Sequence, residues 1–303
     1  MSQERFISSI DKEMLQTARR QFCLDVGLDW QQYLEHPNQK IFIQKTQYAT
    51  GTSFPAGEGA RCYEGKDSFF KAIMCMGQLF LSVDEQIYDW AVEQFGACAP
   101  EWFCEYGNLR KIDEKLGEYG REIADTHVYY LPAAIEKEEV PEGDCLRTEK
   151  EENSNLQWFH QQEILRFQEK NRFTSAICFS HTQPDVLAVA AIKGAVECVL
   201  QAHFGDSGGC GKCFDQEAMA GMAGASEDGA YLWQIGINVV PECAGKGLAA
   251  ELVRSLKNEI IRRGKVPFYG TSESHTISQT VALKAGFVPA WTEIYVCRRK
   301  EGC

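Results

Sequence analysis

The chain has 303 residues, a formal net charge of −12 and 13 cysteines. The excess of acidic side chains argues against nucleic acid as a partner and mildly favours cationic substrates such as amines. No apolar run approaches the roughly 18 residues of a membrane span, so we expect no membrane association. Because the cysteines form no regular framework and the start, Met1–Arg5, lacks a basic and apolar leader, we expect a reducing, cytoplasmic location.

The first 135 residues (1–135) indicate an N-terminal α/β domain without a catalytic motif. A strand-like run covers Phe69–Val83, a helix-like stretch follows through Phe95, and another helix is expected over Leu109–Gly120. A short aromatic strand, Val128–Leu131, closes this half. The segment 136–155 is dense in glutamate and lacks aromatic residues, so we interpret it as an acidic linker.

The remaining residues, 156–303, are expected to form a second domain. Their first apolar side chains, over Leu156–Phe167, are spaced as in an opening helix. A later glycine-rich stretch contains Cys210 and Cys213, but a single Cys-x-x-Cys pair supplies only part of a structural zinc site, which needs four ligands. We therefore interpret this stretch as an inserted loop with incidental cysteines, and we predict no metal site.

The most informative stretch is a strand, a turn and a helix in that order. Alternating apolar side chains over Tyr231–Val240 predict a half-buried strand with one mixed, more polar face. Apolar side chains from Leu248 to Ile261 recur at helical spacing, and Gly264 is placed to end that helix. Between them lies the glycine-containing turn Ala244–Ala249. This succession is typical of a site that binds the phosphates of a nucleotide-like cofactor.

Glycines suit such a turn because the backbone must approach an anion closely, which a Cβ would obstruct. The free N–H groups at the start of the following helix then point at the negative charge. Lys246 adds a positive charge beside them. A glycine at a helix entry is equally consistent with ordinary turn geometry, so the turn by itself does not decide the function.

Two separate motifs give the second half a resemblance to the GNAT superfamily of acyl-CoA-dependent N-acyltransferases. Ala244–Ala249 is similar to the family's Gln/Arg-x-x-Gly-x-Gly/Ala turn, and Ser278–Phe287 is similar to its closing helix, which ends in Gly-Phe. The resemblance implies a GNAT-type mixed central sheet flanked by helices, with acetyl-CoA as co-substrate. It also implies that the strand before the turn splays from its neighbour, so that the pantetheine arm pairs with the open strand edge. The residues that it places against the cofactor are Ile237, Asn238, Val239, Val240, Ala244, Gly245, Lys246, Gly247, Leu248, Ala249, His275 and Ser278.

Some positions depart from the family pattern. Ala244 replaces the leading Gln or Arg, Ala282 stands where many members have a tyrosine acid, and Trp233–Gln234 stand where some have a glutamate base. A thiol with a pKa of roughly 8.5 leaves without strong acid help, whereas an alkyl amine with a pKa of about 10.4 must first lose a proton. Glu273 is our candidate base and Tyr269 our candidate acid, although both are also consistent with ordinary loop and core roles.

A helix with a glycine near its end, followed by a short aromatic strand, closes both halves of the chain. The first half is therefore a candidate degenerate GNAT-like copy of the second, with coincidence as an equal alternative. As a copy it would form one wall of the substrate site or the surface of a homodimer.

We predict a cytoplasmic transferase, a GNAT-type N-acetyltransferase that moves an acetyl group directly from acetyl-CoA to a primary amine of a small molecule or amino acid. A peptide or protein amine is the nearest alternative acceptor. The alternative from another class is a catalytically impaired CoA-binding protein with a regulatory or assembly role, motivated by Ala244, by Ala282 and by the missing glutamate.

Overall fold

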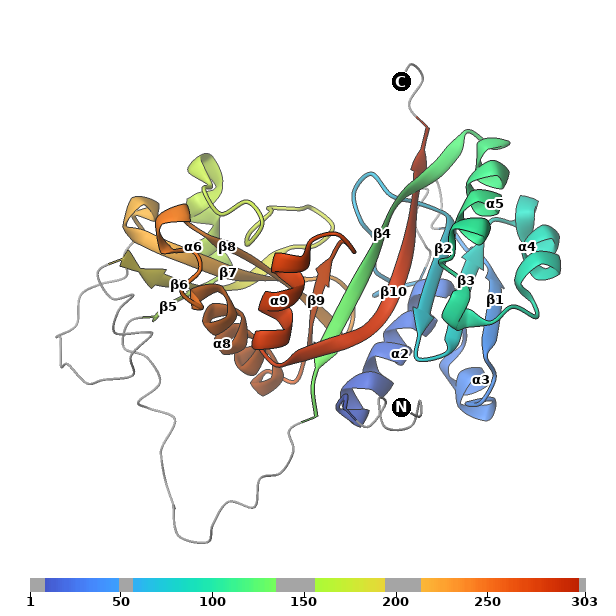
Figure 1. Ribbon diagram of the computed structural model, residues 1–303, viewed down its shortest axis with the longest axis horizontal. Helices are drawn as coiled ribbons and strands as arrows, with labels where there is room; N and C mark the ends of the chain where they lie inside the picture. The colour runs from blue at the N-terminus through green and yellow to red at the C-terminus, as the bar shows by residue number, and fades with distance from the viewer. Residues whose placement is uncertain (1–8, 49–56, 135–155, 194–213, 300–303) are drawn as a thin grey trace, which may run out of the picture.

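One continuous sheet runs through both halves of the chain. The computed structural model describes residues 9–48, 57–134, 156–193 and 214–299. Within these ranges the chain forms a ten-stranded mixed sheet, in the order β1-β3-β2-β10-β4-β9-β8-β7-β6-β5, with helices on both faces (Figure 1). The fold class is therefore mixed α/β, as the sequence predicts. The proposed linker 136–155 and the loop with Cys210 and Cys213 lie outside the described residues.

The described part of the first half supplies both helices and strands. Its elements are α2 (Lys12–Val26), α3 (Trp30–Glu35), β1 (Ile41–Lys45), β2 (Asp67–Cys75), β3 (Gln78–Val83), α4 (Tyr88–Phe95), α5 (Tyr106–Gly117) and β4 (Arg121–Pro132). The run Phe69–Val83 is a hairpin of β2 and β3 rather than one strand. Its turn is formed by Met76 and Gly77, both with positive φ (47° and 77°), as tight hairpins require.

The second half begins with a strand. Its elements are β5 (Leu156–His160), α6 (Gln161–Ile164), β6 (Asp185–Ile192), β7 (Met219–Glu227), β8 (Leu232–Val239), α8 (Leu248–Arg262), β9 (Val266–Thr271), α9 (Thr276–Lys284) and β10 (Phe287–Arg298). The expected opening helix over Leu156–Phe167 was therefore wrong. Residues 156–160 pair antiparallel with β6, and the helix begins only after His160, where the side chain of Glu163 accepts a hydrogen bond from the His160 N–H.

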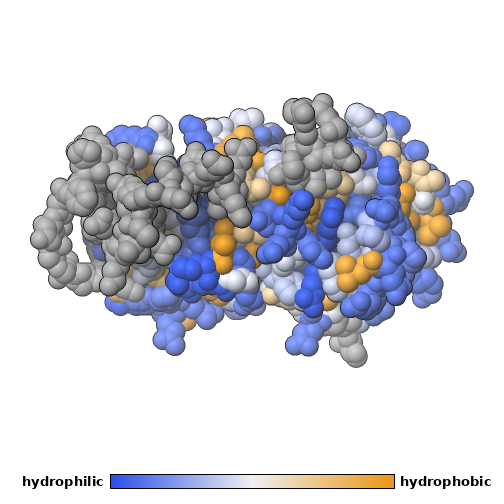
Figure 2. Space-filling model, turned by 90° about the horizontal axis from the view of Figure 1, so that it is seen from below, coloured by the Kyte–Doolittle hydropathy of each residue, from blue (hydrophilic) through white to orange (hydrophobic). Residues whose placement is uncertain are grey.

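Apolar side chains from both faces of the sheet form the core. The helix α2 packs across the junction, because its Phe22 shares a cluster with Phe80 of β3 and Phe268 of β9. On the other side, α4 and α5 cover β2, β3 and β10, whereas α8 and α9 cover the strands of the second half. The face seen in Figure 2 is largely hydrophilic, with apolar residues in small separate areas. The formation of a homodimer stays a prediction.

Two neighbouring strands inside the sheet are the last described strands of the two halves. Both β4 and β10 have 12 residues, and they pair antiparallel along their length. Each follows a helix and a glycine with positive φ, namely Gly120 (67°) and Gly286 (83°). The carbonyl of each glycine accepts a hydrogen bond from the residue just beyond the partner strand, with N···O distances of 2.9 Å from Arg299 to Gly120 and from Ala133 to Gly286.

The irregularities of these strands repeat as well. The register shifts twice, and each shift leaves the fourth residue of one strand without a partner: Ala124 in β4 and Ala290 in β10. His127 and Glu293 pair at the centre, and the hydroxyl of Tyr129 donates to that of Tyr295 over 3.2 Å. This local two-fold symmetry supports a duplication of the closing helix–strand units. It does not extend outward, because β2 and β3 are antiparallel whereas β8 and β9 are parallel.

Candidate functional site

The predicted strand, turn and helix are all present. The side chains of Trp233 and Ile235 are buried against α8, and Leu232 faces the opposite cluster, so β8 alternates as expected. The helix α8 begins at Leu248 and ends before Gly264, which has a φ of 75°. The sequence periodicities therefore located this unit to within one or two residues.

The turn before α8 presents backbone N–H groups to solvent. Gly245 and Gly247 have φ values of 77° and 87°, and a Cβ at either position would meet no heavy atom within 4 Å. Among the described residues no side chain caps α8, although the first N–H groups of a helix have no acceptor within it. Lys246 is exposed beside them. An open, uncapped turn of this kind fits the phosphates of a CoA-like molecule.

The two strands beside the turn diverge. The parallel pairing of β8 with β9 covers only Leu232 to Ile235, although β8 continues to Val239 and β9 to Thr271. On its other side β8 stays paired with β7 as far as Val239. One edge of β8 from Gly236 to Val239 is therefore unpaired among the described strands. It offers the backbone groups that an extended ligand needs in order to add to a sheet.

A loop from the second half packs flat against β7 and β8. Gly224 and Gly236 are cross-strand partners, and a Cβ on them would lie 2.0 Å from the Ala176 carbonyl oxygen and 1.9 Å from that of Ser175, respectively. The side chain of Asn238 accepts hydrogen bonds from the N–H groups of Ser175 (2.6 Å) and Ala176 (3.1 Å). These two glycines thus permit the close approach, and the Asn238 side chain is occupied in holding the loop.

The remaining residues proposed from the family resemblance lie around β9 and α9. The Tyr269 hydroxyl is 2.8 Å from Ser278 Oγ, and burial raises the pKa of Tyr269. His275 is exposed at the N-terminal end of α9. Glu273 is exposed too. The pKa of the Cys104 thiol is raised to about 12, first by the burial of that thiol and second by the negative charge of Glu273. Glu273 does not line the described pocket, and its role as base stays a prediction.

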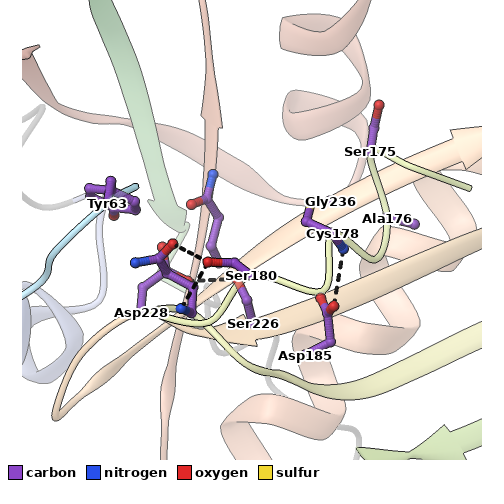
Figure 3. A pocket seen from close by; sticks show the side chains of 11 residues that line it. Tyr63, Ser175, Ala176, Cys178, Ser180, Asp185, Ser226, Asp228 and Gly236 are labelled. Carbon is purple, nitrogen blue, oxygen red and sulfur yellow. Dashed lines mark hydrogen bonds between the residues drawn. The ribbon is translucent and has the colours of Figure 1, made fainter. Parts of the chain in front are cut away.

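A pocket of about 140 Å³ lies beside β8. Figure 3 shows Tyr63, from the first half, at one side of the pocket. Ser180, Ser226 and Asp228 lie close together in this view, and Asp185 lies below Cys178. The residues that line it are Tyr63, Ser175, Ala176, Cys178, Ser180, Gln183, Asp185, Ser226, Asp228, Gln234 and Gly236. Since Gly236 also begins the unpaired edge of β8, the pocket and the proposed cofactor edge meet at this residue.

Asp228 carries the most perturbed carboxyl of the pocket. It is 3% exposed, its Oδ1 accepts from Ser226 Oγ over 2.6 Å, and its Oδ2 has no hydrogen-bond partner among the described residues. Burial raises the pKa of Asp228 to about 7, against lowering effects of Ser226, Tyr63 and Arg61. A buried carboxyl with a pKa near neutrality can accept a proton at physiological pH.

The hairpin that carries Asp228 is held by the first half of the chain. Gln21 of α2 accepts from the Tyr231 N–H over 3.0 Å and donates to the Gly59 carbonyl over 2.8 Å. The Gly59 carbonyl also accepts from the Ala230 N–H over 3.0 Å. A Cβ at Gly229 would lie 2.7 Å from Gln21 Nε2, which explains the glycine at the tip of the hairpin.

Tyr63 is positioned by a buried ion cluster. The Arg61 side chain donates to Asp25 Oδ2 (2.6 Å) and to Glu293, and the Trp291 indole N–H also donates to Glu293 (2.7 Å). The side chains of Arg61, Asp25 and Glu293 are fully buried. Arg61 therefore anchors the segment that brings Tyr63 to the pocket.

Sequence reasoning missed Asp228, Tyr63 and Gln183. No short-range motif marks them, and their proximity depends on the hairpin, on the first half and on the loop before β6. Tyr63 brings the first half of the chain to this pocket, and the role of that half as one wall of the substrate site stays a prediction.

Comparison with known proteins supports the family resemblance for one part of the chain. Residues 213–296 match the family model described as FR47-like protein. This part of the chain therefore forms an FR47-like, GNAT-related domain. No curated protein matches the chain.

Several solved structures are similar at low identity. A putative GNAT acetyltransferase from Novosphingobium aromaticivorans DSM 12444 has 13% identity and a TM-score of 0.36, over 60% of this chain and 69% of that chain. A GNAT acetyltransferase from Colwellia psychrerythraea has 11% identity and a TM-score of 0.33, over 72% and 76%. A tandem GNAT protein from the clavulanic acid biosynthesis pathway has 11% identity and a TM-score of 0.34, over 62% and 58%. These values are too low to support conclusions about this chain.

Two further features concern membrane crossing and metal binding. In the described ranges, no helix is both long and apolar enough to cross a membrane. Nor do three or more His, Cys, Asp or Glu side chains come together there in a way that could hold a metal ion. Cys210 and Cys213 lie outside those ranges.

Proposed function

We propose that the protein is an N-acetyltransferase that binds acetyl-CoA along β8 and the turn 244–249 and transfers the acetyl group to a primary amine of a small molecule or amino acid. The observation that carries this proposal is the divergence of β8 from β9, which leads directly into an open, uncapped helix start. The FR47-like match over the same residues supports it. A cytoplasmic location remains part of the proposal.

Bound acetyl-CoA would supply an activated acyl group as a thioester. The N–H groups on the free edge of β8 between Gly236 and Val239 are placed to donate to an oxyanion. In this proposal Asp228 would accept the proton that the amine must lose, and Glu273 remains the candidate predicted from sequence. Tyr269 is protonated at neutral pH, and burial raises its pKa further, so it would act as the proton donor for the departing thiolate.

Titration calorimetry with acetyl-CoA tests the cofactor site. We expect wild-type protein to bind, and Gly247→Trp to lose at least about tenfold in affinity, because the new side chain covers the N–H groups of the turn. The matched control is Gly264→Trp at the other end of α8. Gly264 also has a positive φ, 75°, and open surroundings, so backbone strain is similar there. Equal affinity of wild type and Gly247→Trp would contradict the site.

The choice of base is tested by pH–rate profiles. If Asp228 accepts the proton, Asp228→Asn abolishes the acidic limb of kcat/KM, while Glu273→Gln leaves that limb in place. An acidic limb that persists in Asp228→Asn and disappears in Glu273→Gln would instead identify Glu273 as the base.

One observation favours the catalytically impaired alternative. Ala282, at the place of the family's tyrosine acid, is fully buried and carries no proton donor. Acetyl-CoA binding without acetylation of any amine in a broad panel would support a regulatory or assembly role.

A further inference from the structure

Three polar atoms of the pocket point to the chemistry of its ligand. Asp228 Oδ2, Gln183 Nε2 and the Tyr63 hydroxyl are buried and make no hydrogen bond of normal geometry with the described residues, although the Tyr63 hydroxyl is near enough to Asp228 to lower its pKa. We propose that the pocket binds a small primary ammonium compound that carries a neutral oxygen acceptor and no carboxylate, such as an amino alcohol. The inference rests on the proposed function in treating this pocket as the acceptor site.

Asp228 selects the cationic end of this ligand. Its Oδ1 is held by Ser226, and its unpartnered Oδ2 remains for one strong donor. An ionised carboxylate in so buried a place is costly unless it is paired with a positive charge. A ligand ammonium supplies both the charge and the donor.

Gln183 selects the neutral oxygen. Ser180 Oγ accepts from the N–H groups of Thr182 and Gln183, both over 3.2 Å, so its lone pairs are used and its proton must be donated. The nearest of the acceptors around it is Gln183 Oε1, 2.9 Å away, compared with 3.3 Å to Thr182 Oγ1 and 3.4 Å to Glu64 Oε1. This bond fixes the amide with Nε2 turned away from Ser180, as an unused donor for a ligand oxygen.

The charge of the lining excludes a carboxylate. None of the described residues that line the pocket is Lys, Arg or His, whereas two are aspartates. Arg61 is not a lining residue, and it is already paired with Asp25 and Glu293, although its Nη1 has no hydrogen-bond partner among the described residues. A ligand carboxylate would therefore face Asp228 without a compensating cation, which disfavours its ionised form. The inference narrows the broader class of amines and amino acids to primary amines whose other polar group is an uncharged oxygen.

The pocket is small, at about 140 Å³. Three two-carbon amines of matched size test its preference: ethylamine has no oxygen, ethanolamine has a neutral one, and glycine has a carboxylate. Ligand-observed NMR titrations at pH 8, without acetyl-CoA, measure their dissociation constants.

We expect ethanolamine to bind about fivefold more tightly than ethylamine, as one added hydrogen bond allows, and at least about tenfold more tightly than glycine. Asp228→Asn should abolish ethanolamine binding, and Gln183→Leu should remove its advantage over ethylamine. The control is Glu227→Gln, because Glu227 lies on the same hairpin but bonds to Lys265, 3.2 Å away, and is not a lining residue. That variant should bind like the wild type.

Glycine binding as tightly as ethanolamine, or no binding of any of the three amines, would overturn the inference. So would unchanged ethanolamine binding in Asp228→Asn. A separate acetylation assay distinguishes this failure from failure of the proposed function. Acetylation of amino acids in preference to amino alcohols would support the proposed transferase function and contradict the ligand class. Ethanolamine binding without acetylation would support the ligand class and contradict the transferase function.

Discussion

The buried carboxyl of Asp228 lowers the stability of the free protein whenever it is ionised. Its pKa of about 7 in the folded state lies above the ordinary 3.8, so folding favours the protonated form. The destabilisation is therefore absent below about pH 4, grows as the pH rises toward 7 and is complete above it. The charged and titrating groups that act on Asp228 or respond to it are Arg61, Glu293, Tyr63, Tyr129 and Cys178.

Asp228→Asn should accordingly stabilise the protein at pH 8. We expect its free energy of unfolding to exceed that of the wild type by up to about 4 kcal/mol, since each pKa unit is worth about 1.4 kcal/mol. Near pH 4 the two proteins should be similar. Urea denaturation at both pH values measures the difference, with Glu227→Gln as the control. A variant less stable than the wild type at pH 8 would contradict the buried charge.

Glu293 illustrates the opposite case, a buried charge whose partners are present. Glu293→Gln leaves Arg61 with Asp25 alone inside the protein, and we expect a loss of about 3 kcal/mol in the free energy of unfolding. The exposed Glu114, which pairs with Arg110 at 3.9 Å, serves as the control. Glu114→Gln should cost less than about 0.5 kcal/mol. Similar losses in the two variants, measured by urea denaturation, would show that the cluster is not the anchor described above.

At the scale of elements, the sequence predicted those helices and strands whose apolar side chains recur with a regular local period. The strand β8, the turn and α8 were predicted because alternation, glycines and helical spacing follow each other without interruption. β5 was misread as helical because Leu156 and Trp158 alternate over too few residues to distinguish the two periods. Asp228 could not be found, since its burial comes from Tyr63, Gln21 and the loop before β6, which are distant in sequence.

The contact between this loop and β8 gives a prediction for Gly236. Gly236→Ala places a Cβ 1.9 Å from the Ser175 carbonyl oxygen, so the loop must move away from β8. We expect a loss of about 2 kcal/mol in the free energy of unfolding and weaker ethanolamine binding. Gly107→Ala in α5 is the control, because no heavy atom lies within 4 Å of its Cβ position and alanine favours a helix. An intact pocket in Gly236→Ala would show that the loop adapts.

At the scale of the whole molecule, the halves predicted as 1–135 and 156–303 share a single sheet. β4 of the first half lies between β9 and β10 of the second, and β10 lies between β2 and β4. The tandem pattern was visible in sequence as two helix–glycine–strand endings. The position of β4 between β9 and β10 was not visible in the sequence, because pairing between strands that are distant in the chain leaves no local signal.

This interlocking predicts that the second half does not fold alone. Residues 146–303 expressed without the first half lack β4, so β9 and β10 each lose a partner and expose unpaired strand edges. We expect this fragment to aggregate, and we expect coexpression with residues 1–145 to yield a soluble complex of both fragments. Size-exclusion chromatography and circular dichroism measure assembly and folding. A monomeric 146–303 that unfolds cooperatively by itself would instead establish the second half as an independent domain, with β4 as a dispensable addition to its sheet.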